Sequence, residues 1–143
     1  MTDFVQRVAM KAVLVHNGKI LLLREADTYE EGTNIGKYHM PGGRINPGEH
    51  WQDGLEREVF EETGIKNITV DKPLFVDEWF PTIKGVPTHI VVMFHLCRTS
   101  SEQVILSIEH DAYVWVGPQE WQKLHVMSPE DKVIEQAFLL LAA

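Results

Sequence analysis

The alternation of apolar and polar positions in the first part of the chain predicts a β-hairpin followed by a loop. Two runs rich in Val, Ile and Leu fill residues 4–25, and they meet at Asn17-Gly18. This pair favours the positive φ angles of a tight hairpin turn. Residues 26–37 are polar and contain glycine but show no periodicity, so we expect a loop before a short strand at residues 38–43.

A helical period replaces this alternation over residues 50–63. Trp51, Leu55 and Val59 recur at steps of four, which predicts that they form the buried face of a helix. Gly64 follows where a left-handed residue would end such a helix.

The remainder of the chain predicts three more strands and a final helix. Apolar runs predict these strands at residues 68–80, 88–98 and 112–117. Ser128 and Pro129 are expected to be the N-cap and first residue of an amphipathic helix that continues to the chain's end. We therefore expect one mixed α and β domain over residues 1–143.

Composition and charge narrow the possible partners. The chain has 143 residues, of which 44% are hydrophobic and 24% charged, as in ordinary globular proteins. A formal net charge of −8 disfavours binding to nucleic acid, because the phosphate backbone is also negative. No apolar run is long enough to span a membrane, and the single cysteine, Cys97, fits a reducing compartment. We expect a cytoplasmic protein.

The predicted central helix carries an unusual group of carboxylates. Glu58, Glu61 and Glu62 share one face at the edge of the buried side, with Gly54 one turn earlier on the same stripe. Like charges at this spacing are destabilising unless they are neutralised, and residues 38–65 contain no lysine. A divalent cation such as Mg²⁺ would neutralise them. The alternative at this point is a solvated acidic face.

The residues around these glutamates resemble the Nudix hydrolase family. Gly43, Glu49 and the run from Arg57 to Ile65 match the family's signature at every fixed position. The resemblance implies a mixed central β-sheet between helices, an α+β fold arranged as an α/β/α sandwich. It also implies Mg²⁺- or Mn²⁺-dependent hydrolysis of a nucleoside diphosphate linked to another group.

The resemblance also implies roles for individual residues. Arg57 would orient the glutamates, and the expected metal shell consists of Glu58, Glu61, Glu62, the backbone carbonyl of Gly42 and, through water, Glu49. Glu109, just ahead of a predicted strand, is the expected base or metal ligand from a later loop, or else a surface loop residue. Glu58 is the competing base, and the sequence leaves that choice open.

Substrate contacts are predicted from single residues. Arg44 and Arg24 are candidates to bind phosphate, with solvent exposure as the alternative for each. Trp79 and Phe80 are candidates to stack on a base, with strand-end packing as the alternative. His39 and His110 are expected to be structural.

Several functional alternatives remain open. Pro81 has the spacing associated with ADP-ribose hydrolases, whereas the compact length is typical of nucleoside triphosphate pyrophosphohydrolases. A nucleotide-binding sensor module is the alternative to an enzyme, and an isopentenyl diphosphate isomerase would need a catalytic cysteine. A small nucleotide is the expected partner, and a homodimer is an open alternative to a monomer.

Overall fold

The computed structural model describes residues 3–27 and 34–143. Residues 28–33 of the predicted loop lie outside this range, so that prediction is checked only at its two ends. The elements are, in chain order, β1 (Val5–His16), β2 (Lys19–Glu25), β3 (Tyr38–His39), β4 (Gly42–Arg44), α1 (Trp51–Thr63), β5 (Ile68–Trp79), β6 (Thr82–Ile83), β7 (Val86–Thr99), β8 (His110–Val116), the 3₁₀ turn η1 (Trp121–Lys123) and α2 (Glu130–Ala142).

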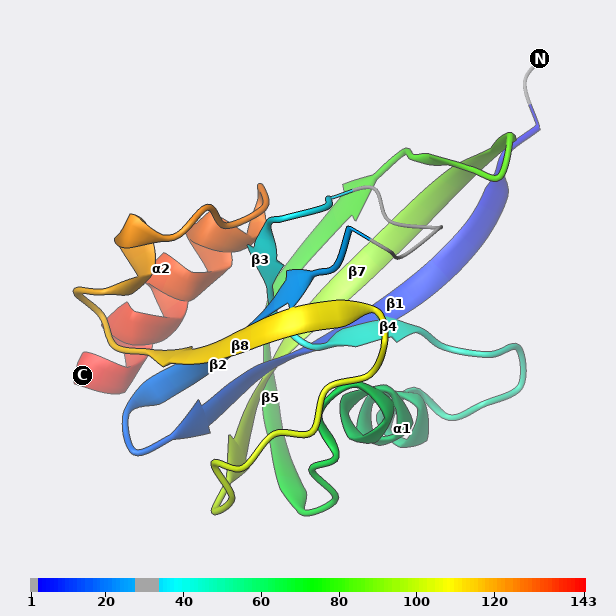
Figure 1. The fold of residues 1–143 in the computed structure, drawn as a ribbon. Helices are drawn as coiled ribbons and strands as arrows, with labels where there is room; N and C mark the ends of the chain where they lie inside the picture. The colour runs from blue at the N-terminus through cyan, green and yellow to red at the C-terminus, as the bar shows by residue number, and fades with distance from the viewer. Residues whose placement is uncertain (1–2, 28–33) are drawn as a thin grey trace.

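The central sheet is mixed and lies between the two α-helices (Figure 1). Its main path runs β3-β2-β1-β7-β5, with β4 beside β1, β6 beside β7 and β8 beside β2. The pairing of β1 with β7 is parallel, and the other strand pairs are antiparallel. This arrangement confirms the predicted α/β/α sandwich.

Alternate residues of the two first strands pack against different helices. On β1, Val13 and Val15 belong to the cluster that includes α2, whereas Ala12 and Leu14 belong to the cluster that includes α1. The same alternation continues on β2. Because side chains of a strand point to opposite faces in turn, both faces of these strands are buried, which explains their nearly continuous apolar runs.

The hairpin turn is confirmed, but the pairing that follows it is shorter than a hairpin predicts. Asn17 and Gly18 both have positive φ, at 50° and 73°. The strands β1 and β2 pair only at the two positions next to this turn. Further along, β4 lies beside β1 and β3 beside β2, so the strands diverge to admit the segment that leads into α1.

Two predictions about the helices need correction. Trp51 does not join the buried face of α1: its side chain is 41% exposed and stacks on His95 at 4.5 Å between ring centroids. Ser128 does not cap α2, because Pro129 is the N-cap and the Glu130 amide already bonds to the Met127 carbonyl. The first-turn Glu130 side chain instead points into the interior, where it is fully buried.

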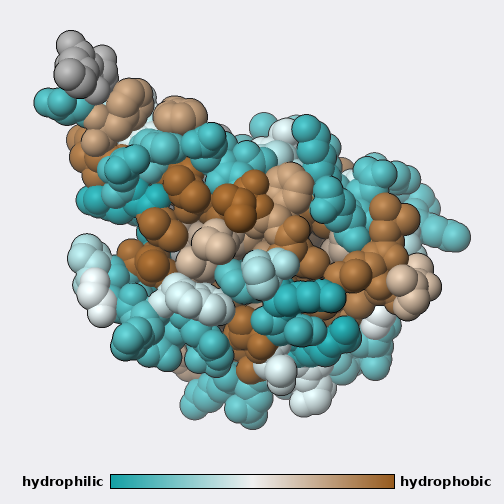
Figure 2. All heavy atoms as spheres, turned by 180° about the vertical axis from the view of Figure 1, so that it is seen from behind, coloured by the Kyte–Doolittle hydropathy of each residue, from teal (hydrophilic) through white to brown (hydrophobic). Residues whose placement is uncertain are grey.

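The surface combines polar regions with exposed apolar side chains. The paired ends of β1 and β7 nearest the N-terminus project from the body, as seen in Figures 1 and 2. Gln6, Arg7 and Val8 are exposed there. No helix in the described part of the chain has the length and apolar character that a membrane span needs.

Candidate active site

Helix α1 presents its glutamates with graded burial, as the stripe geometry predicts. The side chain of Glu61 is 54% exposed and that of Glu58 is 18% exposed. Glu62 is 6% exposed and lies at the boundary with the core. The helix ends at Gly64, whose φ of 73° and bond to the Phe60 carbonyl confirm the predicted left-handed cap.

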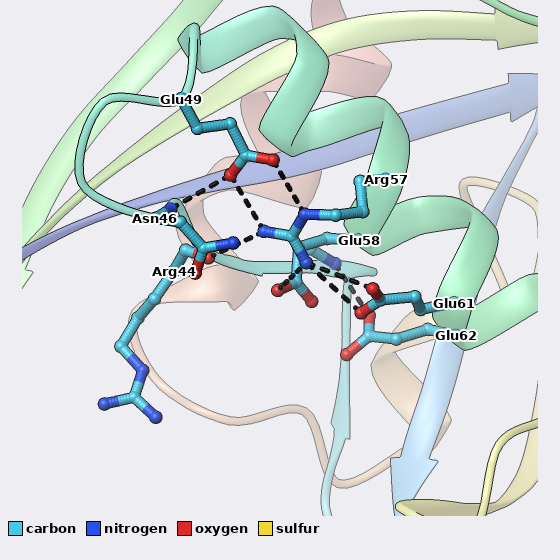
Figure 3. A network of polar contacts seen from close by, with 8 residues as sticks. Arg44, Asn46, Glu49, Arg57, Glu58, Glu61 and Glu62 are labelled. Carbon is cyan, nitrogen blue, oxygen red and sulfur yellow. Dashed lines mark hydrogen bonds and ion pairs between the residues drawn. The ribbon is translucent and has the colours of Figure 1, made fainter.

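Arg57 connects the carboxylates on this face (Figure 3). Its Nε and Nη2 atoms donate to Glu49 at 2.8 and 3.0 Å, which makes a bidentate pair. Its Nη1 atom donates to Glu58 at 3.1 Å and to Glu61 at 3.2 Å. Charge-assisted bidentate pairs are strong and directional, so Arg57 fixes the orientation of the three glutamates.

The Glu49 side chain occupies the space beside Gly54. A Cβ atom on Gly54 would lie 2.9 Å from Glu49 Oε1 and 2.5 Å from a methyl group of Ile45. The glycine therefore makes room for the Arg57–Glu49 pair.

The glycine turn before α1 makes direct contact with the buried glutamate. The Gly42 amide donates to Glu62 Oε1 at 2.8 Å. Gly42 has a φ of 140°, and a Cβ atom there would lie 2.2 Å from the Met10 carbonyl oxygen, so only glycine fits. A Cβ on the next residue, Gly43, would lie 2.7 Å from Glu58 Oε2. Both glycines thus let the backbone approach the carboxylates closely.

Burial shifts the ionisation of the two inner glutamates. Burial raises the pKa of Glu58, while the adjacent Arg57 opposes the shift. Burial raises the pKa of Glu62 well above its ordinary value, and the charges of Glu58 and Glu109 raise it further. Carboxylates that are costly to ionise together fit a site that takes a cation, because the cation restores the favourable charge balance.

The later loop brings Glu109 and His110 to the same place. One ligand atom from each of Glu62, Glu109 and His110 lies within 4.8 Å of the other two. Glu109 directly precedes β8, as predicted, and its charge acts on both Glu58 and Glu62. Residues separated by almost 50 positions in the chain therefore form one acidic cluster with a histidine at its edge.

A cavity of about 570 Å³ opens beside this cluster. Its acidic lining residues are Glu25, Glu58, Glu62 and Glu109, and its basic lining residues are Arg7, Lys11 and Arg44. Its apolar lining comes from Ala9, Ile45, Pro47, Trp79, Pro81, Ile83 and Ile90. A cavity with both charge types and an apolar wall suits a phosphorylated ligand with a flat ring.

The predicted substrate contacts differ in their relation to this cavity. Arg44 and Trp79 line it, and the Arg44 guanidinium points away from the Arg57 contacts (Figure 3). Arg24 pairs with Asp111 at 2.7 Å and does not line the cavity. Phe80 also lies outside its lining, 59% exposed and stacked on His89 at 4.4 Å.

The structure adds buried polar residues that the sequence patterns did not single out. Lys11 interrupts the apolar run of β1 and bonds to Glu130 at the start of α2. Lys11 Nζ also lies 3.0 Å from Nδ1 of His39, and His39 in turn contacts His110 at 2.9 Å. A lysine between the apolar residues 8–10 and 12–15 is the signal that could have drawn attention to this group.

The Glu49–Arg57 pair is expected to stabilise the folded protein at neutral pH and to lose this effect in acid. Bonding to Arg57, with a further bond from the Asn46 amide, lowers the pKa of Glu49 from 4.5 to about 2. Since the folded-state pKa is lowered, the pair's contribution is full above pH 4.5 and disappears as pH falls towards about 2. We expect Glu49→Gln to unfold at lower urea concentration than the wild type at pH 7, with the difference shrinking over that range.

Glu56→Gln, on the same helix but outside the Arg57 contacts, is the matched control for this measurement. The difference in urea midpoint between Glu56→Gln and the wild type should not shrink over the acid range in which Glu49 takes up a proton. A Glu49→Gln difference that stays constant from neutral pH into acid would contradict the role given to the pair.

Comparisons with known proteins agree with this geometry. The family model described as "NUDIX domain" matches residues 5–138. A "MutT-like protein" of Streptomyces ambofaciens is 32% identical over 114 residues, which cover 79% of this chain and 65% of that protein. The "Nucleoside triphosphatase NudI" of Escherichia fergusonii is 28% identical over 121 residues, covering 80% of this chain and 84% of NudI.

A solved structure shows the same arrangement over nearly the whole chain. The "MutT protein" of Methanosarcina mazei Go1 superposes with a TM-score of 0.76 at 26% identity, covering 99% of each chain. The family match extends from β1 into α2 and includes the glutamate helix, the glycine turn and the strands that form the cavity. The chain therefore belongs to the NUDIX domain family and is a Nudix pyrophosphohydrolase.

Proposed function

We propose that this protein is a Mg²⁺-dependent enzyme, also served by Mn²⁺, that cleaves the pyrophosphate linkage of a nucleoside diphosphate joined to another group. Water attacks phosphorus in this reaction. A nucleoside triphosphate is the first substrate candidate, and a nucleotide sugar such as ADP-ribose is the second. The name of the NudI relative and the compact length of the chain favour the triphosphate.

One observation carries the proposal: three carboxylates converge beside a cavity that basic side chains also line. Glu58, Glu62 and Glu109 interact closely enough to raise the pKa of Glu62, which is already raised by burial. Such a group has the oxygen donors that Mg²⁺ and Mn²⁺ prefer. The basic residues Lys11 and Arg44 face the same cavity and match a phosphate chain.

The protein's own groups divide the work. Glu58 and Glu62 would hold the cation from α1, with Glu61 on the solvent side and the Gly42 carbonyl from the glycine turn. When bound, the cation neutralises the diphosphate charge and lowers the pKa of the attacking water. Arg57 and Glu49 keep the glutamates in place through the bidentate pair.

The base that takes the proton of the attacking water is Glu58 or Glu109. Both carboxylates line the cavity, and they approach it from different elements. Glu58 is fixed by Arg57, whereas Glu109 belongs to the segment before β8. Kinetics of the two glutamine variants with a single substrate would separate a base from a residue that only binds metal.

The substrate side of the cavity has a polar and an apolar part. Arg44 is proposed to bind phosphate, and Trp79 to stack on the base beside Ile83 and Ile90. Arg7 lines the same region and is added to the phosphate-binding candidates. Arg24 and Phe80 stay predictions that would need a larger substrate or a rearranged side chain to reach the cavity.

The structure disfavours the isomerase alternative. Cys97 is fully buried in the cluster between β7 and α1, and burial raises the pKa of its thiol to about 12. A thiol that is neither accessible nor ionised is a poor catalytic group. We propose a cytoplasmic enzyme that acts on a small nucleotide and binds neither nucleic acid nor membrane, with a homodimer as an open alternative to a monomer.

A product-release assay tests the proposal. Purified protein with Mg²⁺ is incubated with nucleoside triphosphates (oxidised forms included), ADP-ribose, nucleotide sugars and dinucleoside polyphosphates, and Glu58→Gln protein serves as the blank. Turnover that is absent from the blank is the expected result. A ligand-dependent rise in melting temperature without any product, with Mn²⁺ and alkaline pH also tried, would favour nucleotide sensing instead.

Mg²⁺ is expected to stabilise the folded protein even without substrate. Binding to the folded state alone contributes about 2.7 kcal/mol when the ion is present at 100 times its dissociation constant. Because the pKa of Glu62 is raised, this carboxyl must lose a proton when it binds the ion, so the stabilisation should grow as pH rises. Thermal melts with and without Mg²⁺ at pH 6 and pH 8 measure it.

Glu62→Gln should lose this Mg²⁺ effect without loss of stability in the metal-free state, since it removes a carboxylate that is costly to bury. Glu56→Gln should keep the effect. If Mg²⁺ raised the melting temperature of Glu62→Gln and of the wild type equally, the ion would bind at a site that does not include Glu62.

A further inference from the structure

The ring of His110 lies in the wall of the cavity. One of its nitrogens contacts His39, and the other has no hydrogen-bond partner within the described residues. The contact joins the Nε2 atoms of the two rings at 2.9 Å, and the nitrogen without a partner is the buried Nδ1. The residue is only 6% exposed and directly follows Glu109. Buried polar atoms are nearly always paired, so this nitrogen calls for a ligand.

One tautomer of His39 leaves Nδ1 of His110 without a proton. Nδ1 of His39 lies 2.9 Å from the Met40 carbonyl oxygen, which can only accept, and 3.0 Å from Lys11 Nζ. Lys11 already donates to the carboxylate of Glu130. If His39 donates from Nδ1 to Met40, its Nε2 accepts from Nε2–H of His110. This assignment pairs these groups and leaves Nδ1 of His110 with a free lone pair.

The ring of His110 is close to two carboxylates. A ring nitrogen of His110 and one oxygen each of Glu62 and Glu109 all lie within 4.8 Å of one another. Three ligand atoms spread evenly around one ion, each at about 2.2 Å from it, are about 3.8 Å apart. A movement of at most about 0.6 Å by each atom therefore suffices for the three residues to share an ion.

We propose that Nδ1 of His110 is a direct ligand of a divalent cation that Glu62 and Glu109 also bind, so that this position prefers a transition ion such as Mn²⁺ or Co²⁺ over Mg²⁺. The proposal rests on the proposed metal-dependent function and adds a nitrogen ligand to it. Imidazole binds transition ions well, whereas Mg²⁺ prefers oxygen. The site therefore differs in chemistry from an all-carboxylate site.

The contacts behind His110 suit a metal ligand. A histidine that binds metal usually bonds through its other ring nitrogen to a group that fixes the ring and its tautomer. Here His39 fills that role, and its Nδ1 donates in turn to the Met40 carbonyl. Both nitrogens of His39 are thereby engaged, which leaves His110 as the ligand from this pair.

Pulsed electron paramagnetic resonance on Mn²⁺ tests the proposal directly. The metal-free protein receives less than one equivalent of Mn²⁺, and the echo modulation reports any nitrogen bonded to the ion. We expect ¹⁴N modulation in the wild type, its replacement by the ¹⁵N pattern after labelling with ¹⁵N-histidine, and its loss in His110→Gln. Mn²⁺ affinity should fall by roughly 10-fold or more in that variant, with a smaller change for Mg²⁺.

The controls separate histidine ligation from other effects. His125→Gln changes an exposed histidine and should keep the ¹⁴N modulation. The wild-type labelling experiment stands even if His110→Gln does not fold. Wild-type protein that binds no Mn²⁺, or binds it without nitrogen modulation, overturns the proposal, as does His110→Gln protein that keeps the modulation.

Hydrolysis assays on the same samples separate this inference from the proposed function. Turnover with Mg²⁺ and no nitrogen modulation with Mn²⁺ would overturn the role of His110 and leave the hydrolase intact. Nitrogen modulation without turnover of any substrate would support the metal ligand and count against the hydrolase.

Discussion

Glu58→Gln protein is expected to fold normally and to lose hydrolytic activity by roughly 10²–10³-fold or more in kcat. The substitution keeps the size of a side chain that is already partly buried and packed against Gly43. It removes the negative charge that the cation needs and the carboxylate that competes for the role of base. Loss of an interaction needed in the transition state lowers kcat and kcat/KM together.

Glu56→Gln provides the matched control for this loss, because it changes the same residue type on the same helix two positions earlier. Its kcat should stay within about twofold of the wild type, as expected for a position away from the reacting groups. Steady-state kinetics at saturating Mg²⁺ make the comparison, with circular dichroism to confirm folding. Full activity in folded Glu58→Gln protein would show that Glu58 has no role in the reaction.

Lys11→Met is expected to destabilise the protein by about 3–5 kcal/mol at neutral pH, as found for removal of one partner of a buried ion pair. Lys11 is 6% exposed and Glu130 is fully buried. Burial raises the pKa of Glu130 even with Lys11 beside it, so the lone carboxylate would be costly to ionise. The penalty should shrink as pH falls and Glu130 takes up a proton. Urea unfolding curves measure these differences.

A double-mutant cycle on Lys11 and Glu130 is the control for this prediction. Glu130→Gln alone leaves an unpaired buried ammonium group, whereas the Lys11→Met/Glu130→Gln double variant removes both charges and keeps an oxygen for the Met40 amide. The double variant should be clearly more stable than the sum of the single effects predicts. Lys72→Met, at an exposed position, should change stability little. Additive single effects would contradict the pairing.

The features of the fold that the sequence predicts correctly depend on local spacing. The glutamates of α1 share a face because they lie three and four positions apart, and Gly64 ends the helix at the predicted place. The turn at Asn17-Gly18 follows from the same short-range chemistry. In each case a few neighbouring residues decide the conformation.

The parts that the sequence does not predict depend on partners far away in the chain. The parallel pairing of β1 with β7 joins residues about 80 positions apart, and Lys11 finds its partner at Glu130. His39 and His110, each expected to be only structural, meet across the same distance scale. Apolar periodicity carries no information about which buried polar groups will meet.

Hydrolysis in ¹⁸O-labelled water, followed by mass spectrometry of the products, tests whether water attacks phosphorus with the help of a metal ion. With the best substrate of the release assay, we predict that one phosphate-containing product of the cleaved linkage gains the label. We also predict that chelation of divalent ions stops its formation. Label in a hydroxyl group on carbon, with none in the phosphate groups, would contradict attack of water on phosphorus. Labelled product formed at an unchanged rate after chelation would contradict the proposed metal site.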